Sequence, residues 1–384
     1  MALERSRLVV GLSSSVLEPQ SGGGRLDGIG TYTLELERAL VAHDVDVRRV
    51  GAPHRAGSRL VPPRHASLTF PLPLSYLTAA AASFGANVPF ARRVEREIDV
   101  YHATDYLVPR LASTPVVATL YDAIPLAHPS WANPRLRTVK NWLLRRCAQA
   151  ADLVIAISQA AVAELVEHYG VAPERIRVVP LGVSDRWFDR PGDDFIRNTL
   201  AHRGLRPGFI LHVGTLQPRK NLDALISAYE TLPLPLRSDH QLVLVGKYGW
   251  GADELRARLE RLGSEARVVW LDYVERDELH ALYCAAGLFA YPSLSEGFGL
   301  PVLEALACGL PIVASDLPVL HEVADATARL VDPLRIDAIA DAIETALAAK
   351  ADPAHAAARR AHARKFTWAS CAARTVAVYR ELTM

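Results

Sequence analysis

The sequence has few cysteines, few lysines and almost no net charge. Its four cysteines, Cys147, Cys284, Cys308 and Cys371, lie far apart, without a CxxC pair or a cysteine–histidine spacing typical of metal ligands. This pattern predicts reduced structural thiols, as in a cytoplasmic protein. The net charge of +1 over 384 residues argues against a general nucleic-acid-binding protein, which needs a surplus of basic residues to neutralise phosphates.

Long apolar runs are also missing. Residues 1–6 are polar and charged, and the short apolar run after them is typical of a strand, so no secretory signal is predicted. The stretch most similar to a membrane span, residues 72–91, is interrupted by Pro73, Gly85 and Pro89. We therefore expect a cytoplasmic protein without a membrane-spanning segment.

Short runs rich in Val, Ile and Leu recur along the whole chain. They are Leu8–Leu12, Val45–Val50, Asp99–Ala103, Val116–Tyr121, Leu153–Ile157, Ile176–Pro180, Phe209–Val213, Leu242–Gly246, Val268–Leu271, Leu288–Tyr291, Ile312–Ser315 and Ala328–Val331. Most are apolar on both faces, as in parallel strands buried between helix layers. Amphipathic segments between them include Thr31–Val41, Gln159–Tyr169, Asn221–Thr231, Asp253–Leu262 and Ile336–Ala348.

This alternation of strands and helices occurs twice and predicts an α/β protein of two Rossmann-like domains with doubly wound parallel sheets. We expect one domain over 1–188, a second over 205–365 and a terminal helix within 366–384. Open parallel sheets bind ligands at the carboxyl ends of their strands. The residues just after strands are therefore the first candidates for a site, in a cleft between the domains.

The first such segment runs from Tyr291 to Gly309 and reads YPSLSEGFGLPVLEALACG. A strand ends, a glycine loop follows, and a helix is predicted to begin near Pro301 and end at Gly309. The amides of Gly299 and Leu300 would then lie at a helix N-terminus, which attracts anions. Glu296 and Glu304 on either side suit a ligand with hydroxyls flanking a phosphate. The alternative is a plain strand–helix turn in which Glu296 is a cap.

The second segment is LHVGTLQPRKNL, residues 211–222. Gly214 permits close backbone approach after a strand, with Thr215 next to it. Arg219 and Lys220 then precede a helix and could neutralise a diphosphate. A solvated basic turn is the alternative, but only five of the 43 basic residues are lysines, so a lysine here is an unusual choice.

Two weaker segments lie in the first half. Gly28, Ile29 and Gly30 open the first long helix and could touch the donor phosphate or the acceptor, or form only a flexible loop. Tyr121 and Asp122 follow the fourth strand, where Asp122 either faces the cleft or caps a nearby turn. His102 ends the third strand and is either a binding residue or a satisfied buried histidine.

These segments, in this order, resemble the retaining glycosyltransferases of family 4, which have the GT-B fold. EGFGLPVLE resembles the family's signature of two glutamates with seven residues between them, and VGTLQPRKNL resembles its diphosphate-binding segment. The resemblance covers nearly the whole chain and is strongest in the C-terminal half. It implies that the domain over 1–188 binds the acceptor, that the domain over 205–365 binds the nucleotide sugar, and that the helix within 366–384 crosses back onto the first domain.

The resemblance also implies roles for the matching residues. Glu304 would hold the donor ribose, Glu296 would face the transferred sugar, and Arg219 and Lys220 would stabilise the leaving diphosphate. Further donor contacts would come from Phe298, Gly299, Leu300, Tyr273 and Val274, with Gly28 to Gly30 bordering donor and acceptor. Many members have a histidine where this chain has Tyr121, so the transfer of that role to tyrosine is open.

The segment YDAIP at residues 121–125 and VGKYGW at 245–250, which contains Lys247, resemble the bacterial mannosyltransferases of O-antigen and exopolysaccharide synthesis. The expected donor is GDP-mannose, and the expected acceptor is a saccharide or a lipid-linked saccharide. Fixed positive groups around the diphosphate would make a metal unnecessary, and no Asp-x-Asp follows a predicted strand. A nucleotide-sugar epimerase or hydrolase, and a non-catalytic nucleotide-sugar-binding subunit, remain alternatives.

A basic segment, Trp131–Arg146, could bring the protein to a membrane surface. It contains five basic residues beside Trp142, Leu143 and Leu144. A basic amphipathic helix of this kind can lie on an anionic membrane, and an ordinary solvated helix is the alternative.

Overall fold

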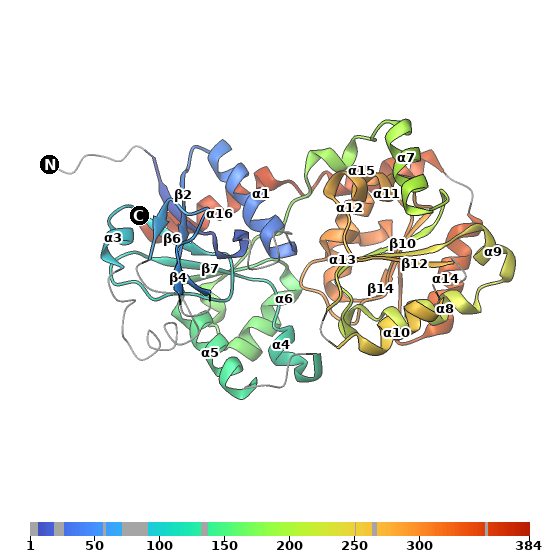
Figure 1. Cartoon of the computed structure of the whole chain (residues 1–384). Coiled ribbons are helices and arrows are strands. Elements are labelled where there is room, and N and C mark those ends of the chain that lie inside the picture. Colours follow the sequence, from blue (N-terminus) through green and yellow to red (C-terminus); the bar gives the residue numbers. More distant parts are fainter. Residues whose placement is uncertain are drawn as a thin grey trace. The chain divides into compact units, whose positions relative to one another are not determined.

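The computed structural model describes residues 7–18, 27–56, 59–70, 91–131, 137–249, 251–262, 267–349 and 352–384. The chain divides into two compact units. Unit 1 contains residues 1–129, 134–182 and 367–384, and unit 2 contains 130–133 and 183–366. Residues 183–204, which the sequence leaves mostly between the two expected domains, therefore group with unit 2. Figure 1 shows the elements of both units.

The strands of unit 1 are β1 (Val9–Ser13), β2 (Asp46–Gly51), β3 (His54–Ala56), β4 (Arg59–Val61), β5 (Leu68–Thr69), β6 (Val100–Ala103), β7 (Val116–Leu120), β8 (Leu153–Ala156) and β9 (Ile176–Val178). Its helices are α1 (Gly28–Ala42), α3 (Arg92–Glu95), α4 (Ile124–Ala127), α5 (Arg137–Ala150), α6 (Gln159–Glu164) with the π-helical continuation η4 (Leu165–Tyr169), and α16 (Trp368–Thr383). Seven strands form a parallel sheet in the order β5-β2-β1-β6-β7-β8-β9, and β3 and β4 form a separate antiparallel hairpin.

The strands of unit 2 are β10 (Ile210–Val213), β11 (Leu242–Val245), β12 (Val268–Leu271), β13 (Leu288–Tyr291), β14 (Ile312–Ser315) and β15 (Arg329–Val331). Its helices are α7 (Asp193–Arg203), α8 (Leu222–Thr231), α9 (Leu234–Asp239), α10 (Asp253–Leu262), α11 (Arg276–Ala285), α12 (Leu300–Cys308), α13 (Pro318–Ala324), α14 (Ile336–Ala348) and α15 (Pro353–Ala363). The parallel sheet has the order β12-β11-β10-β13-β14-β15. Short 3-10 turns are η1 (Ser15–Leu17), η3 (Pro129–Trp131), η5 (Pro173–Arg175), η6 (Asp185–Phe188), η7 (Pro218–Lys220) and η9 (Asp325–Thr327).

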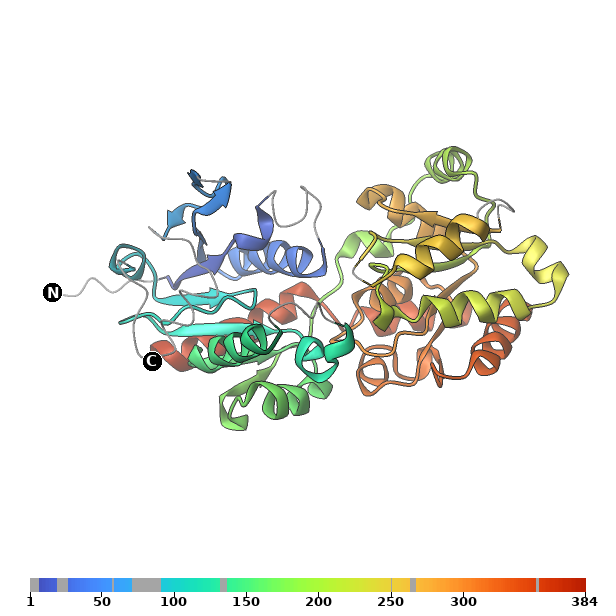
Figure 2. The ribbon, with the colours of Figure 1, turned by 60° about the horizontal axis from the view of Figure 1, so that its bottom comes forward.

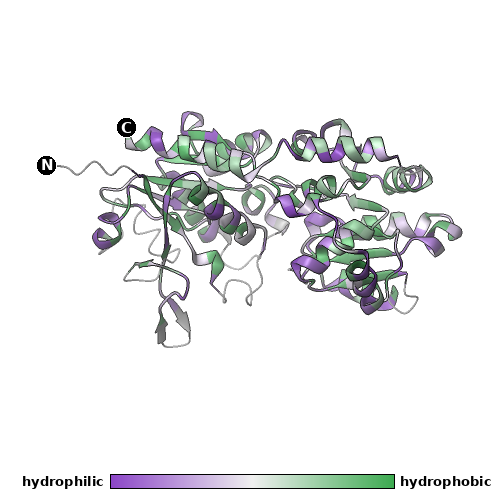
Figure 3. Cartoon of the chain, turned by 90° about the horizontal axis from the view of Figure 1, so that it is seen from above, coloured by the Kyte–Doolittle hydropathy of each residue, from purple (hydrophilic) through white to green (hydrophobic). Residues whose placement is uncertain are grey.

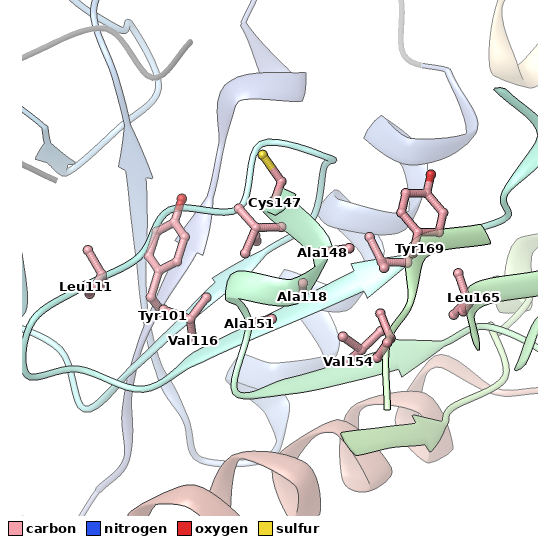
Figure 4. Close-up of a cluster of buried hydrophobic side chains, with 14 of the residues drawn as sticks. Tyr101, Leu111, Val116, Ala118, Cys147, Ala148, Ala151, Val154, Leu165 and Tyr169 are labelled. Carbon is pink, nitrogen blue, oxygen red and sulfur yellow. The ribbon is translucent and has the colours of Figure 1, made fainter. Parts of the chain in front are cut away.

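The sheets are apolar because helices cover both of their faces. In β7, β8, β11, β13 and β14 every residue is buried, and many of the strand residues are green, the colour of hydrophobic residues, in Figure 3. Figure 4 shows part of the core of unit 1, where Tyr101, Val116, Val154 and Tyr169 pack together. The predicted fold class is confirmed: all twelve predicted strands form, each within two residues of its expected ends. The short strands β3, β4 and β5 lack a buried apolar run and were not predicted.

The terminal helix α16 packs in unit 1 against α1 (Figure 2). It begins where the side chain of Thr367 accepts a hydrogen bond from the amide of Ser370, at 3.0 Å. A chain of polar contacts joins it to the sheet: the Tyr379 hydroxyl lies 2.6 Å from Nδ1 of His102, whose Nε2 lies 2.8 Å from the Thr119 hydroxyl. Among the described residues, no helix is both long and apolar enough to cross a membrane.

Candidate active site

The order of the unit 2 sheet creates a place where two connections diverge. β10 is hydrogen-bonded to β11 on one side and to β13 on the other. The chain leaves β10 and β13 toward opposite halves of the sheet, and ligands bind at such switch points in open α/β sheets. The two sequence segments with the strongest predicted chemistry follow these two strands, so the topology brings them together.

The loop after β10 is held rigidly against the loop after β13. Asn221, the residue between η7 and α8, has a positive φ of 55°, and its side-chain amide donates to the carbonyls of Pro292 at 3.0 Å and Pro333 at 2.7 Å. The amide of Leu294 donates to the carbonyl of Arg219 at 2.7 Å. These bonds fix the backbone of the residues that carry the two basic side chains.

Arg219, Lys220 and Glu296 form a cluster, which we call the charged triad. Nη1 of Arg219 donates to Oε2 of Glu296 at 3.0 Å and to the carbonyl of Ser295 at 3.1 Å. Nζ of Lys220 donates to Oε1 of the same carboxylate. The Lys220 and Glu296 side chains are only 5% and 6% exposed, and Arg219 is 23% exposed. Two cations and one anion leave a net positive charge, held in place before any ligand arrives.

Lys220 is packed against an aromatic ring. Nζ of Lys220 donates to the hydroxyl of Tyr291 at 2.5 Å and lies 4.6 Å from the centre of its ring. The Tyr291 ring is stacked on His212, with centroids 5.5 Å apart. Burial, with the Lys220 charge, lowers the pKa of His212 to about 3, so this imidazole is neutral and adds no charge. A side chain at Gly214 would put its Cβ 3.2 Å from Cε of Lys220, so glycine leaves the space that the lysine occupies.

Glu296 remains ionised in spite of its burial. Burial alone would raise the pKa of its carboxyl, but the charges of Lys220 and Arg219 and their hydrogen bonds outweigh that effect and hold the pKa at about 2. The carboxylate therefore persists at neutral pH as the anion that orients both cations. A plain capping role, the alternative left by the sequence, does not describe these contacts.

The helix α12 begins beside this loop, as predicted. Gly299 is its N-cap with φ of 101°, a backbone conformation that side chains disfavour, and a Cβ there would lie 3.0 Å from Cδ2 of Leu320. In the described structure no side chain caps this N-terminus. The partial positive charge of the helix end is therefore not offset by a capping carboxylate.

Glu304 lies one turn into α12, and its environment differs from that of Glu296. Its Oε2 accepts a hydrogen bond from the Tyr283 hydroxyl at 3.2 Å. Burial raises the pKa of Glu304 to about 7, since the tyrosine hydrogen bond and the positive charges of Arg276 and Arg186 offset only part of the desolvation. The two glutamates thus have strongly different acidities, which suits different roles.

The remaining candidate residues of unit 2 differ in how far they are exposed to solvent. Thr215, Lys247, Tyr273 and Leu300 are half-buried in loops or at a helix start, where ligand contact remains a prediction. Val274 is 6% exposed. Phe298 is also buried and packs edge-on against Phe366, with centroids 6.1 Å apart, so its ring is a core group. Only its backbone remains a candidate for a ligand contact.

In unit 1, the glycine segment forms the first turn of α1. Gly28, Ile29 and Gly30 are helical, and the Asp27 carboxylate accepts a hydrogen bond from the Gly30 amide at 2.8 Å. A Cβ at Gly28 would meet nothing within 4 Å, so this face of the turn is open. Gly22 to Gly24, which precede it, lie outside the described residues. Contact of this turn with donor or acceptor remains a prediction.

The structure gives His102 the less reactive of its two predicted roles. It is fully buried, and both ring nitrogens have hydrogen-bond partners, Tyr379 and Thr119. Burial lowers its pKa to about 3. His102 therefore has the contacts of a satisfied core histidine that links α16 to the sheet, and a substrate contact for it stays a prediction.

Tyr121 and Asp122 also have partners within unit 1. The Tyr121 side chain is 7% exposed, and its hydroxyl donates to the carbonyl of Thr104 at 2.7 Å. Asp122 accepts hydrogen bonds from the amide of Ile124 at 3.1 Å and from the Tyr106 hydroxyl at 3.4 Å. The turn-capping role of Asp122 is thus present, and a catalytic role for it remains a prediction.

Two functional neighbours escape sequence reasoning. The sequence predicts Tyr291 only as the end of a strand and places Tyr283 in no predicted element, yet they contact Lys220 and Glu304. A signal existed for the first, because Tyr291 is the last residue of a strand that leads directly into the acidic segment.

Comparison with known proteins places the chain among the glycosyltransferases. Residues 199–365 match the family model of glycosyl transferases group 1, and residues 26–187 match that of glycosyltransferase family 4. O-antigen chain mannosyltransferase B of Escherichia coli is 32% identical over 288 residues, which is 74% of each chain. The serotype-specific mannosyltransferase WbdA of Escherichia coli is 32% identical over 67% of this chain but only 32% of its own length.

Solved structures show the same architecture. A sucrose-phosphate synthase from Thermosynechococcus elongatus superimposes with a TM-score of 0.73 at 22% identity, covering 98% of this chain and 99% of that one. At this identity the likeness concerns the fold, a GT-B arrangement of two Rossmann-like domains. The sequence matches go further than the fold: with both family models matched and a relative 32% identical over 74% of this chain, the chain belongs to glycosyltransferase family 4.

Proposed function

We propose that this chain transfers mannose from GDP-mannose to a saccharide or lipid-linked saccharide acceptor in the synthesis of a cell-surface polysaccharide. The transfer retains the anomeric configuration and needs no metal ion. The observation that carries the proposal is the charged triad beside the uncapped start of α12. The choice of mannose is supported by the Escherichia coli relatives, which are named mannosyltransferases.

The chemical difficulty in such a transfer is departure of the nucleoside diphosphate. As the bond from the anomeric carbon to the phosphate oxygen breaks, negative charge grows on the diphosphate. Arg219 and Lys220 stabilise that charge, and because Glu296 already fixes them, little reorganisation is needed during the reaction. The acceptor hydroxyl then bonds to the anomeric carbon on the side of the leaving group, and its proton passes to the departing phosphate oxygen.

The remaining donor contacts divide between the two ends of the nucleotide. Glu304, with the higher pKa, accepts hydrogen bonds from the ribose hydroxyls, and the start of α12 at Gly299 and Leu300 receives a phosphate. Thr215, Lys247, Tyr273 and Val274 complete the donor site. Asp122 contributes to catalysis, and the turn at Gly28 to Gly30 borders donor and acceptor.

A panel of nucleotide sugars tests the donor assignment. We expect GDP-mannose to raise the melting temperature more than UDP-, ADP- or dTDP-sugars, because ligands that bind only the folded state stabilise it by mass action. With a saccharide acceptor the product should be an α-mannoside, identified by NMR, and added Mg²⁺ or Mn²⁺ should leave the rate unchanged. Release of free mannose with no acceptor product would indicate a hydrolase instead. Equal stabilisation by all donors would contradict the choice of base.

The lipid-linked acceptor implies work at a membrane surface. In α5, Val139 and Trp142 are 53% and 38% exposed, and Lys140 and Arg146 are exposed beside them. Residues 132–136 of the basic segment lie outside the described residues. We expect co-sedimentation with anionic phosphatidylglycerol vesicles but not with neutral phosphatidylcholine vesicles.

The matched variants for this membrane prediction differ only in where charge is removed. Lys140→Gln combined with Arg146→Gln should abolish vesicle binding. The pair Arg256→Gln and Arg261→Gln, which removes the same charge from α10, should not. Equal loss in both pairs would mean that only net charge matters, and no loss in either would remove the membrane surface from the proposal.

A further inference from the structure

A histidine and two cysteines converge in unit 2, on the two helices that also carry Tyr283 and Glu304. His280 and Cys284 lie one helical turn apart on α11, so both side chains are on the same face of that helix. Cys308 is the last residue of α12. One ligand atom from each residue, an imidazole nitrogen or a sulfur, lies within 4.8 Å of the other two.

The cluster is enclosed by protein but incompletely satisfied. His280 is 5% exposed, its ring packs edge-on against Trp187 with centroids 5.1 Å apart, and its Nε2 is buried without a hydrogen-bond partner in the described structure. Such buried, unpaired polar atoms are uncommon. The two cysteines are half-buried and reduced, so an ion could reach their sulfurs.

These residue types favour one class of ligand. A nitrogen and two sulfurs suit a borderline or soft cation such as Zn²⁺ and do not suit Mg²⁺ or Ca²⁺, which prefer oxygen. Around a tetrahedral Zn²⁺ with bonds of about 2.0–2.3 Å, neighbouring ligand atoms are roughly 3.5–3.8 Å apart. Spacings of at most 4.8 Å therefore need only rotamer adjustments to close on an ion.

We propose that His280, Cys284 and Cys308 form a three-ligand Zn²⁺ site that ties α11 to the end of α12. Both thiols release their protons to solvent as the two zinc–sulfur bonds form, and water fills the fourth position. The residue before Cys284 is Tyr283, and Cys308 follows Glu304 by one turn. The ion therefore fixes the two helices that carry the Tyr283–Glu304 hydrogen bond. Zinc has a structural role here and takes no part in the transfer.

Cobalt substitution tests the site without relying on activity. The full chain is purified with a reductant, treated with a chelator and titrated with Co²⁺. We expect one Co²⁺ per chain, with a thiolate-to-cobalt charge-transfer band and the visible bands of tetrahedral Co²⁺, all of which disappear when Zn²⁺ is added. Zn²⁺ should also raise the melting temperature.

The variants separate this cluster from other thiols. Cys284→Ser, Cys308→Ser and His280→Gln should each weaken Co²⁺ binding at least tenfold, and either cysteine variant should weaken the charge-transfer band. Cys371→Ser and Cys147→Ser, at buried cysteines of unit 1, should leave both unchanged. Circular dichroism and the melting temperature of the metal-free variants confirm that each one folds.

Three outcomes would overturn the proposal. The first is a wild-type titration without a thiolate band. The second is an unchanged band in folded Cys284→Ser and Cys308→Ser. The third is a disulfide between Cys284 and Cys308, detected by mass spectrometry, under reducing conditions in which Zn²⁺ also fails to bind. None of these results bears on sugar transfer, so the proposed function stands or falls separately.

Discussion

Replacing Lys220 with methionine is expected to slow turnover by roughly 100- to 1,000-fold while changing the donor KM much less. Methionine keeps much of the side-chain length and removes the charge that stabilises the leaving diphosphate, an interaction that strengthens as the transition state forms. Steady-state kinetics with GDP-mannose measures both constants. Lys365→Met, at an exposed lysine of unit 2, is the control and should behave as wild type.

The same substitution should also destabilise the fold, and this second effect can be separated from the first. Without Lys220 the buried Glu296 keeps only Arg219 as an ionic partner, and removing one member of a buried ion pair typically costs about 3–5 kcal/mol. The double variant Lys220→Met with Glu296→Gln removes both charges and should recover most of that loss in urea unfolding. It should remain inactive, because stability is restored without the cation.

Arg219→Ala gives the matching contrast. Arg219 is more exposed than Lys220, so its removal should cost less stability, while turnover should still fall strongly. Kinetics of Lys220→Met and Arg219→Ala within a few-fold of wild type would show that the triad holds the two loops together and does no more. The proposal that Arg219 and Lys220 stabilise the departing diphosphate would then be wrong.

The sequence was sufficient for the fold because the fold depends on local pattern. Each buried strand of the two sheets is a short run rich in Val, Ile and Leu. Such a run is apolar on both faces, which is typical of a strand in a parallel sheet covered by helices. The exceptions were β3 to β5, of two or three residues each, which contain no such run.

The site was predictable in composition but not in its contacts. The sequence placed Glu296 with the sugar and Arg219 with the phosphate as separate contacts, whereas the structure pairs them directly. That pairing depends on β10 and β13 being neighbours, although they are far apart in sequence. His102 illustrates the opposite case: its position at a strand end indicated a ligand contact, but Tyr379, 277 residues away, occupies one of its nitrogens.

The thiols show a third limit of sequence reasoning. The sequence contains no CxxC pair near this cluster, because its third ligand, Cys308, comes from another helix. Within α11, however, His280 and Cys284 are four residues apart, which places two metal-binding side chains on one face. The four-residue spacing of His280 and Cys284 was therefore a usable signal.

Glu304 carries the second large prediction, because its acidity lies within the physiological range. Its pKa is raised to about 7 from an ordinary 4.5, so near neutral pH about half of the molecules have it protonated. Ribose hydroxyls donate to a carboxylate, so donor binding favours the ionised form. We therefore expect donor affinity to rise as pH rises through about 7, with release of a proton on binding. Calorimetry in buffers of different ionisation enthalpy measures that proton.

Glu304→Gln should remove this pH dependence and weaken donor binding by roughly 10- to 100-fold, the loss expected for hydrogen bonds to a charged group. Tyr283→Phe should act differently. It removes a hydrogen bond that lowers the pKa of Glu304, so the pH at which affinity rises should move above that of the wild type. The exposed Glu344→Gln is the control and should change neither property.

Stability should respond to pH in the opposite direction from binding. Because the pKa of Glu304 is higher in the folded chain than in the unfolded chain, its favourable contribution is complete below about pH 4.5 and is lost as pH rises through about 7. Glu304→Gln never ionises, so at about pH 8 it should be more stable than wild type by about 1–3 kcal/mol and at about pH 5 nearly equal to it. Urea unfolding at both values measures the difference. If Glu304 is buried in order to bind its ligand, Glu304→Gln should bind the donor poorly and yet be more stable than wild type at about pH 8. A loss of stability at both pH values would instead show that Glu304 stabilises the core.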